Sequence, residues 1–324
     1  MKPTIHKYIY TFNYENIERD LCLLESKYIF TKEVNNKLLF SDLEVSPSSS
    51  AFIKNRLEII SFSLNYADLI HKIKKEHIRV DEFKVEYIVF EGDTTAYAER
   101  LEKLREIGFC IEGMHEYYKP TITYAVCYHQ GTWYFGVLLK NNFEWHKHKQ
   151  KPHSFSNSIS VNIGKSLVNI AAKANKETTL LDACCGVGTI LLEARFAGFT
   201  MDGCDINEKT AKNAQINLAY FNYTAHIYHS DIKDIKGSYD AAIIDLPYNL
   251  FTSATDSAIE HIMTYTAKIT DRLVIVSISD ITDVIHTIGF HIVDYCSVSK
   301  RGKTAFSRKI WVCERIRKEV VTDH

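Results

Sequence analysis

Four short apolar runs in the second half of the chain each end on an aspartate, and this regularity constrains the fold more than any other feature. "TLLD" ends at Asp182, "MDGCD" at Asp205, "HIYHSD" at Asp231 and "AIID" at Asp245. Helical apolar spacing separates these runs, and alternating strands and helices predict a parallel sheet with helices on both faces. A strand buried on both faces does not tolerate a lone charge inside it. We therefore expect the four carboxylates at the carboxyl edge of the sheet, where open α/β sheets bind ligands.

A glycine turn, Gly186-Val187-Gly188, follows the first of these strands and opens a helical stretch. The dinucleotide fingerprint needs a small residue three positions after its second glycine, but Leu191 stands there. A P-loop needs Lys-Ser/Thr after its last glycine, and no Lys or Arg lies between Asp182 and Glu193 to balance a pyrophosphate. The turn could be a plain strand-to-helix connection, but its place at the edge of an open sheet favours a binding site for a ligand without phosphate.

The acidic edge indicates a ligand that offers positive charge and hydrogen-bond donors. S-adenosylmethionine carries an amino group, a sulfonium, ribose hydroxyls and an exocyclic adenine amine, and it has no phosphate. Gly186 and Gly188 would let the backbone pass close to its methionine end. Asp205 lies 17 residues after Gly188, which suits ribose hydroxyls as in dinucleotide folds, and Asp231 is expected near the adenine amine. Any one of these aspartates could instead be a turn residue or a helix cap, so the hypothesis depends on their recurrence.

The fourth strand runs into Asp245-Leu246-Pro247-Tyr248, which has the residue types needed to methylate an exocyclic amine of a base. Such an amine is a poor nucleophile because its lone pair is delocalised into the ring. The Asp245 carboxylate and the Leu246 carbonyl could accept its N–H groups, with Asp245 as the proton acceptor. Pro247 fixes the backbone that aims this carbonyl, and Tyr248 offers a ring on which an extruded base can stack. Taken alone, the segment could also be a β-turn with an outward ring.

These motifs resemble those of known enzymes. "DLPY" is similar to the Asp/Asn-Pro-Pro-Tyr/Phe motif of methyltransferases that modify exocyclic amines of bases, with Leu246 where the family usually has proline. "DACCGVGTILLEA" resembles their glycine-rich first motif. The segment "KPHSFSNSISVNIGKSLVNIA" resembles the entry to the first catalytic helix of the THUMP-containing tRNA guanine-N2 methyltransferases of the position-ten type, with Gly164-Lys165 in place of Ala-Arg. The likeness of residues 1–145 rests on the order of their elements.

The resemblance implies an α/β fold, in which a Rossmann-like class I methyltransferase domain (166–324) follows an α+β RNA-binding region. That region would comprise a ferredoxin-like segment (1–60), a THUMP-like domain (61–145) and a junction (146–165). The resemblance also implies tRNA as substrate, S-adenosyl-L-methionine as cofactor, a small helper subunit as a candidate partner and a cytoplasmic location. The cofactor-binding residues would be Phe155, Ser156, Asp182, Cys184, Gly186, Gly188, Thr189, Asp205, Ile206, Asp231, Ile232 and Asp245.

Any contact with nucleic acid has to come from local charge, because the formal net charge of the chain is -1. Two basic clusters with interleaved aromatic residues meet this need, since lysine and arginine neutralise phosphates and aromatic rings stack on bases. We expect the RNA-binding residues to be Lys147, Lys149 and Lys151 in the junction, and Arg301, Lys303 and Arg308 near the end of the chain. Each cluster could equally be a solvated face.

Several other functions remain open on the sequence alone. A DNA adenine-N6 methyltransferase would use the same motifs, and a non-catalytic RNA-binding protein could keep the fold. A nicotinamide oxidoreductase is disfavoured by Leu191 and the acidic edge. We expect no metal, because no cysteine or carboxylate follows His146 and His148 at zinc spacing. The eight cysteines include no C-x-x-C pair, which suits a reducing cytosol, and no apolar run predicts a membrane span.

Overall fold

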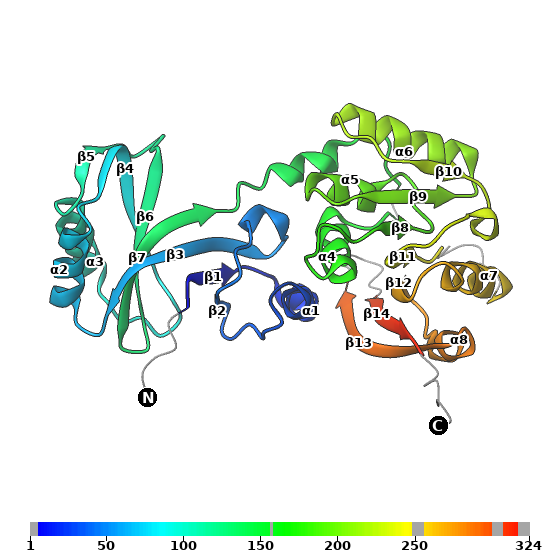
Figure 1. Cartoon of the computed structure of the whole chain (residues 1–324), viewed down its shortest axis with the longest axis horizontal. Coiled ribbons are helices and arrows are strands. Elements are labelled where there is room, and N and C mark those ends of the chain that lie inside the picture. The colour runs from blue at the N-terminus through cyan, green and yellow to red at the C-terminus, as the bar shows by residue number, and fades with distance from the viewer. Residues whose placement is uncertain (1–5, 156–157, 248–255, 300–306, 317–324) are drawn as a thin grey trace, which may run out of the picture. The chain divides into compact units, whose positions relative to one another are not determined.

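The computed structural model describes residues 6–155, 158–247, 256–299 and 307–316, which form two compact units (Figure 1). Both units are discontinuous in sequence. The first consists of Met1–Asn13, Val34–Ser48 and Phe52–Asn142, and the second of Tyr14–Glu33, Ser49–Ala51 and Phe143–His324. The boundary expected at residue 60 falls inside a strand of the first unit, which runs from Ile53 to Ser63.

A seven-stranded sheet in the order β2-β1-β3-β7-β6-β4-β5 forms the first unit. Neighbouring strands are antiparallel from β2 to β6 and parallel from β6 through β4 to β5. Gln130 and Gly131, both with positive φ, form the two-residue turn of the hairpin expected over residues 122–139. The strands are β1 (Tyr8–Phe12), β2 (Leu38–Ser41), β3 (Ile53–Ser63), β4 (Arg79–Ile88), β5 (Glu112–His115), β6 (Ile122–His129) and β7 (Thr132–Lys140).

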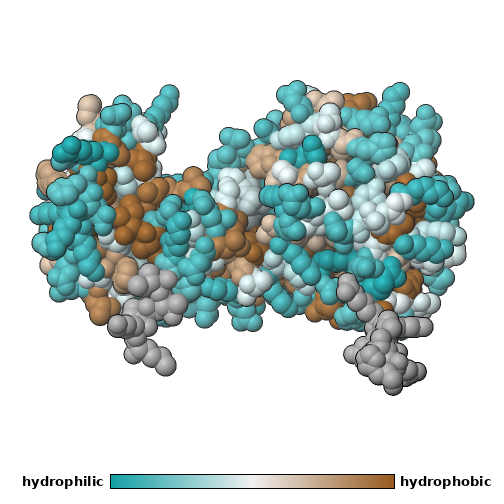
Figure 2. Space-filling view, in the orientation of Figure 1, coloured by the Kyte–Doolittle hydropathy of each residue, from teal (hydrophilic) through white to brown (hydrophobic). Residues whose placement is uncertain are grey.

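Helices α2 (Tyr66–Lys75) and α3 (Tyr97–Gly108) cover this sheet where the apolar spacing predicts helices. Leu69 and Ile73, four residues apart on α2, are fully buried and pack into a core that includes Phe83. The outer face of α2 is hydrophilic (Figure 2). This mixed α+β unit agrees with the architecture expected for the N-terminal region, while its assignment as ferredoxin-like and THUMP stays a prediction.

The sheet of the second unit has the order β10-β9-β8-β11-β12-β14-β13. The first five strands of that order are parallel, and β14 pairs antiparallel with both β12 and β13. The chain order reverses between β8 and β11, which makes their carboxyl ends the place where an open sheet holds a ligand. The strands are β8 (Leu180–Asp182), β9 (Met201–Asp205), β10 (Ile227–His229), β11 (Ala241–Asp245), β12 (Arg272–Ser277), β13 (Phe290–Ser299) and β14 (Ser307–Arg315).

Helices cover both faces of this sheet. Because parallel crossovers are right-handed, α5 and α6 on the way to β10 cover one face, and α7 on the way to β12 covers the other. Ile244 and Ile275 belong to the core on the α7 side. The doubly wound Rossmann-like sheet predicted from the sequence is therefore confirmed. The helices are α4 (Val161–Ala172), α5 (Thr189–Phe196), α6 (Glu208–Tyr220), α7 (Asp256–Ala267) and α8 (Thr282–Thr287), with short 3-10 turns η1 (Asn16–Glu18), η2 (Pro47–Ser49), η3 (Glu144–Gln150) and η4 (Ile232–Asp234).

Helix α1 (Arg19–Phe30), from the start of the chain, packs in the second unit against α4 and β13. Lys27 Nζ lies 2.6 Å from Asp294 Oδ1, and the Tyr28 hydroxyl donates to the same carboxylate. The fully buried Glu25 accepts from Asn169 Nδ2 on α4 at 2.6 Å. The sequence places this segment in the N-terminal region, because nothing in its local pattern reveals partners that lie more than 100 residues away.

The segment expected as a polar junction also contributes to the core of the second unit. Its turn η3 buries Trp145 and His148, and His148 Nδ1 shares a 2.6 Å hydrogen bond with Glu193 Oε1 of α5. Lys165 Nζ of α4 lies 3.6 Å from the other carboxylate oxygen of Glu193. The three buried side chains are thus paired by one hydrogen bond and one ion pair, which offsets part of the cost of burying their charges. In the part of the chain that the structure describes, no helix is long and apolar enough to span a membrane.

Candidate active site

A pocket of about 770 Å³ opens at the carboxyl edge of the second sheet. Its walls come from the turn between β8 and α5, from the ends of β9, β10 and β11, and from α7. No lysine or arginine is among the described residues that line it. The residues of the sequence prediction that the structure brings together in this wall are Cys184, Gly186, Asp205, Ile206, Asp231, Ile232, Asp245 and Pro247.

The glycine turn has the backbone geometry that requires glycine. Gly186 has φ 54° and Gly188 has φ 79°, a left-handed conformation that other residues rarely adopt. A Cβ on Gly186 would have no other atom within 4 Å, and Gly186 lines the pocket. A Cβ on Gly188 would lie 3.1 Å from the Cβ of Ala214 on α6. Gly186 therefore keeps the pocket open, while Gly188 allows the turn to approach α6.

Asp205 connects the end of β9 to the glycine turn. Its Oδ2 accepts from the Gly186 N–H at 3.0 Å, and its Oδ1 accepts from the Asn207 N–H at 2.8 Å. Burial raises the pKa of Asp205, and the two N–H donors oppose that rise. A carboxylate fixed in this way presents its remaining lone pairs to the pocket in one orientation.

Asp182, at the end of β8, lies behind this wall. It is fully buried, and neither carboxylate oxygen completes a hydrogen bond within the described structure. Burial raises its pKa well above the usual value, and the nearby Asp245 adds to that rise. Asp182 thus lies next to the candidate site, behind the residues that line the pocket.

Asp231, beyond the end of β10, has a partner that no sequence pattern predicts. His261 Nε2, on α7, lies 2.8 Å from Asp231 Oδ1, and the Lys233 N–H donates to the same oxygen at 3.0 Å. Burial opposes ionisation of Asp231, but these two donors outweigh it and lower the pKa of the carboxyl group. No spacing in the sequence relates a histidine on α7 to β10, so only the fold could reveal the pair. The other lining residues that were not predicted are Ala183, Cys204, Ser230, Ser257, Ala258 and Ile262.

Asp245 ends β11 and lines the pocket. Its Oδ1 is buried without a hydrogen-bond partner among the described residues. Burial raises the pKa of Asp245 to about 7, and the charge of Arg308 opposes this rise. The ladder continues for one more residue, since the Leu246 N–H donates to Val276 O at 3.0 Å, and the Leu246 side chain is buried. Pro247 is exposed and lines the pocket.

The remaining predicted cofactor residues lie outside the wall of the pocket. Gly188 and Thr189 are buried at the start of α5, and Phe155 is 54% exposed. Ser156 falls outside the described residues, as does the predicted base-stacking ring of Tyr248. Their roles stay predictions.

The two cysteines of the turn are poor nucleophiles. Burial raises the pKa of both Cys184 and Cys185 well above the ordinary value, and the neighbouring Asp182 and Asp205 add to the effect. These pKa shifts favour packing over thiol chemistry at both positions.

The predicted RNA-binding residues divide into three groups. Lys147 and Lys149 are exposed on η3, and Lys151 is half-buried, which lowers the pKa of its amine. Arg301 and Lys303 lie outside the described residues. Arg308 is only 4% exposed and its charge acts on Asp245, so the structure places it beside the candidate site and not on the open surface expected for a phosphate contact. The charge run around it resembles a solvated face, and sequence could not show that strand β14 turns this one residue inward.

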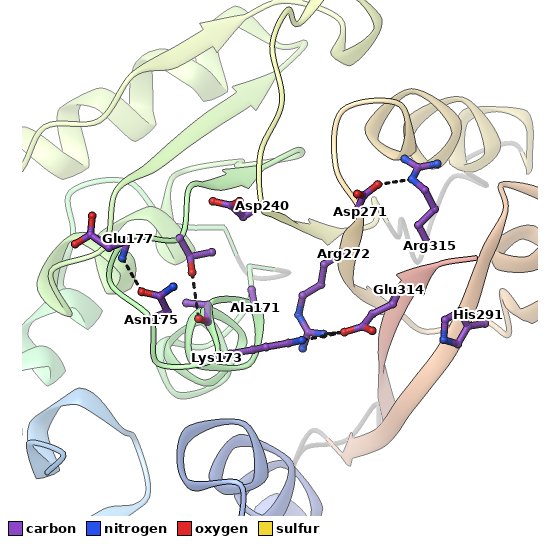
Figure 3. A pocket seen from close by; sticks show the side chains of 12 residues that line it. Ala171, Lys173, Asn175, Glu177, Asp240, Asp271, Arg272, His291, Glu314 and Arg315 are labelled. Carbon is purple, nitrogen blue, oxygen red and sulfur yellow. Dashed lines mark hydrogen bonds and ion pairs between the residues drawn. The ribbon is translucent and has the colours of Figure 1, made fainter. Parts of the chain in front are cut away.

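A second hollow, of about 820 Å³, lies at the opposite, amino edge of the sheet (Figure 3). Five of its charged side chains pair with one another: Arg272 Nη1 lies 2.7 Å and Lys173 Nζ 2.9 Å from Glu314 Oε1, and Arg315 pairs with Asp271. Charges neutralised in this way offer a ligand little, and ligands of open sheets bind at the carboxyl edge. The carboxyl-edge pocket is therefore the candidate site.

Comparison with known proteins supports the resemblance that the motifs predict. No family model matches the sequence. The chain is 29% identical over 121 residues to the tRNA (guanine(10)-N2)-dimethyltransferase of Methanothermobacter thermautotrophicus, which covers 36% of this chain and 35% of that protein. It is 27% identical over 184 residues to the enzyme of the same name from Pyrococcus abyssi, which covers 53% and 54%. The match thus spans about a third to a half of the length of these two relatives.

Solved structures show lower similarity. TrmN from Thermus thermophilus has a TM-score of 0.47 and 15% identity, and the match covers 95% of this chain and 99% of that one. Magnesium protoporphyrin IX methyltransferase from Synechocystis, solved with bound SAM, has a TM-score of 0.42 and 21% identity over 54% of this chain and 93% of that one. The fold assignment given above rests on the strand order and not on these scores.

Proposed function

We propose that this protein is an S-adenosylmethionine-dependent methyltransferase that modifies the exocyclic N2 of a guanine in tRNA. The observation that carries the proposal is the position of Asp245, which lines a carboxylate-rich pocket and whose buried Oδ1 has no hydrogen-bond partner among the described residues. The names of the curated relatives specify guanine ten of tRNA, and we propose the same position here. We also propose that the protein acts in the cytoplasm.

The residues of the pocket fit the proposed cofactor. S-adenosylmethionine presents cationic and N–H or O–H donor groups, and this wall presents carboxylates without a lysine or arginine among its described residues. Asp205 would accept from the ribose hydroxyls, Asp231 from the adenine amine, and the backbone beside Gly186 would face the methionine end. When bound, the cofactor supplies an electrophilic methyl group.

Asp245 prepares the nucleophile. Its carboxylate accepts one N–H of the guanine amine while the Leu246 carbonyl accepts the other, which localises the nitrogen lone pair. The carboxylate then takes the proton that the amine loses, so it has to be ionised before the reaction. A pKa of about 7 makes Asp245 a stronger base than an exposed aspartate and still leaves much of it ionised at neutral pH.

The exposed lysines of η3 would contact the phosphates of tRNA. Reversing the charge of Lys147 and Lys149 to glutamate should weaken tRNA binding and flatten its dependence on salt, because fewer counterions are released. The matched control reverses Lys209 and Lys212, two exposed lysines of α6. An equal loss of tRNA affinity in both double variants would indicate a general effect of charge and would exclude η3 from the interface. We also propose a small helper subunit as a candidate partner of this protein.

The function is tested with purified protein, labelled S-adenosylmethionine, unmodified tRNA and duplex DNA, followed by mass spectrometry of the nucleosides. We expect N2-methylguanosine or its dimethyl form from tRNA, and N6-methyladenosine from neither substrate. Asp245→Ala should abolish transfer while cofactor affinity stays close to wild type. Methylation of DNA adenine alone, or no transfer by protein that binds the cofactor normally, would overturn the proposal.

A further inference from the structure

Arg308 is a charged residue in the interior of the second unit, close to the candidate site. It is 4% exposed, on strand β14, and it does not line the cofactor pocket. An arginine is rarely buried without a carboxylate or another acceptor nearby. Its charge acts on Asp245, where it opposes the effect of burial on the pKa of that carboxyl group.

The register of three strands explains this proximity. Asp245 on β11 is opposite Val276 on β12, and Val276 is opposite Ile310 on β14, so the three lie in one row across the sheet. Arg308 is two residues from Ile310, and side chains two apart on a strand share a face. Because β14 runs antiparallel to β12, Arg308 lies closer than Ile310 to the carboxyl edge of the sheet, beyond the level of Ser277, the last paired residue of β12. Asp245 and Arg308 therefore project from the same face at the same edge, with one strand between them.

A carboxylate beside a guanidinium matches the hydrogen-bonding edge of guanine. Guanine presents the N2 amine and N1–H as donors and O6 as an acceptor along one edge, whereas adenine carries an amine at the position of O6. A guanidinium has five N–H donors and no acceptor, so it can serve a carboxylate and a second oxygen together. If adenine lies against the guanidinium, its amine faces an N–H of the guanidinium, and one of these two donors remains without an acceptor.

We propose that Arg308 is a specificity-determining residue that donates to O6 of the target guanine while Asp245 accepts from the N2 amine. The inference rests on the proposed function, since it presupposes a guanine substrate. This role replaces the phosphate contact expected for Arg308 from the sequence. It also predicts that substitution of Arg308 does not change the affinity for the cofactor.

The test separates O6 from the amine. Two tRNAs are assembled from synthetic fragments, one with guanosine and one with 2-aminopurine riboside at the methylated position, which keeps the 2-amine and lacks both O6 and the N1–H, so the effect of O6 is assigned from the response of the ratio to Arg308→Met. We measure single-turnover methyl transfer, and also affinity for each RNA with S-adenosylhomocysteine present. Wild-type protein should prefer guanosine by roughly tenfold to a hundredfold, the range of a good arginine contact to a guanine edge. Arg308→Met should bring that ratio toward one in both measurements.

Two further variants control the result. Lys309→Met changes the next residue of β14, which points to the opposite face and lies 3.8 Å from Asp280, and it should keep the wild-type ratio. Arg308→Lys keeps the charge and loses the planar fork, so its ratio should fall between the two. Cofactor affinity and thermal unfolding of each variant establish that it is folded.

The outcomes distinguish this inference from the proposed function. If wild-type protein methylates guanosine and 2-aminopurine equally well, O6 is not read and the inference is wrong, while the proposed function stands. If wild-type protein does not methylate the guanosine tRNA at all, the proposed function itself fails. An unchanged ratio in folded Arg308→Met would show that another group reads O6, which also overturns the inference.

Discussion

Replacing Asp245 with asparagine should stabilise the protein at alkaline pH and slow methyl transfer, because an amide still accepts an N–H of the base but cannot take its proton. The side chains have nearly the same shape, so the change removes a charge and little else. Burial raises the pKa of Asp245 from 3.8 to about 7, with Arg308 opposing, so the folded state resists ionisation of this group. Each pH unit between these values corresponds to about 1.4 kcal/mol, and full ionisation therefore costs the folded state about 4 kcal/mol at most.

The sign of the pH dependence follows from the raised pKa. Below the unfolded value of 3.8 the group is neutral in both states and no penalty exists. As pH rises toward 7, the unfolded chain ionises while the folded protein holds its proton, so wild-type stability falls relative to the variant. Above that pH the difference is constant. We thus expect Asp245→Asn to match wild type near pH 4 and to exceed it by up to about 4 kcal/mol at pH 8.5.

Urea unfolding followed by tryptophan fluorescence measures this difference. Trp145 and Trp311 belong to the second unit and Trp133 to the first, so a Trp133→Phe background reports on the unit that contains Asp245. The same samples are assayed for transfer to tRNA. A gap between Asp245→Asn and wild type that does not change from pH 4 to pH 8.5 would show that the carboxylate bears no ionisation penalty, and the reasoning about its basicity would fall with it.

Three further changes test the surroundings of the site. Asp205→Asn should lower S-adenosylmethionine affinity roughly tenfold or more in isothermal titration calorimetry, because a charge-assisted acceptor is lost; unchanged affinity would exclude the ribose contact. Glu193→Leu should lower the free energy of unfolding by roughly 3–5 kcal/mol in urea titrations, since Lys165 then stays buried without its carboxylate; a neutral effect would mean that the cluster is hydrated. Gly186→Ala and Gly188→Ala should each lower the free energy of unfolding by roughly 1–2 kcal/mol through their left-handed φ, and Gly188→Ala by more because its Cβ would contact α6. Only Gly186→Ala should weaken cofactor binding directly; the reverse pattern would exchange their roles.

The sequence predicted the features that local pattern controls. Alternating strands and helices define the second sheet, and a charge at the end of each buried strand has to emerge at its carboxyl edge. Asp205, Asp231 and Asp245 therefore appear in one pocket wall, as expected. The left-handed φ of Gly186 and Gly188 likewise follows from their place in a tight turn.

The features that sequence missed depend on contacts between distant segments. His261 reaches Asp231 only because α7 packs over the end of β10, and 30 residues of chain separate the two. Arg308 belongs to a basic run that is typical of a solvated face, but the register of β12 and β14 turns it toward Asp245. His148 looked like part of a polar linker until Glu193 supplied a buried partner. In each case the decisive partner lies on another element, which a local pattern does not encode.

Helix α1 has a consequence for how the protein is made. Every strand of the first sheet lies between Tyr8 and Lys140, so that sheet can assemble as soon as those residues leave the ribosome. Helix α1 emerges at the same time, but its partner Asp294 is synthesised more than 260 residues later. A fragment that begins at Phe143 would lack Glu25, Lys27 and Tyr28, and it would leave α4 and β13 bare where α1 should cover them. The second unit therefore completes its fold only when strand β13 meets helix α1, which is synthesised more than 260 residues earlier.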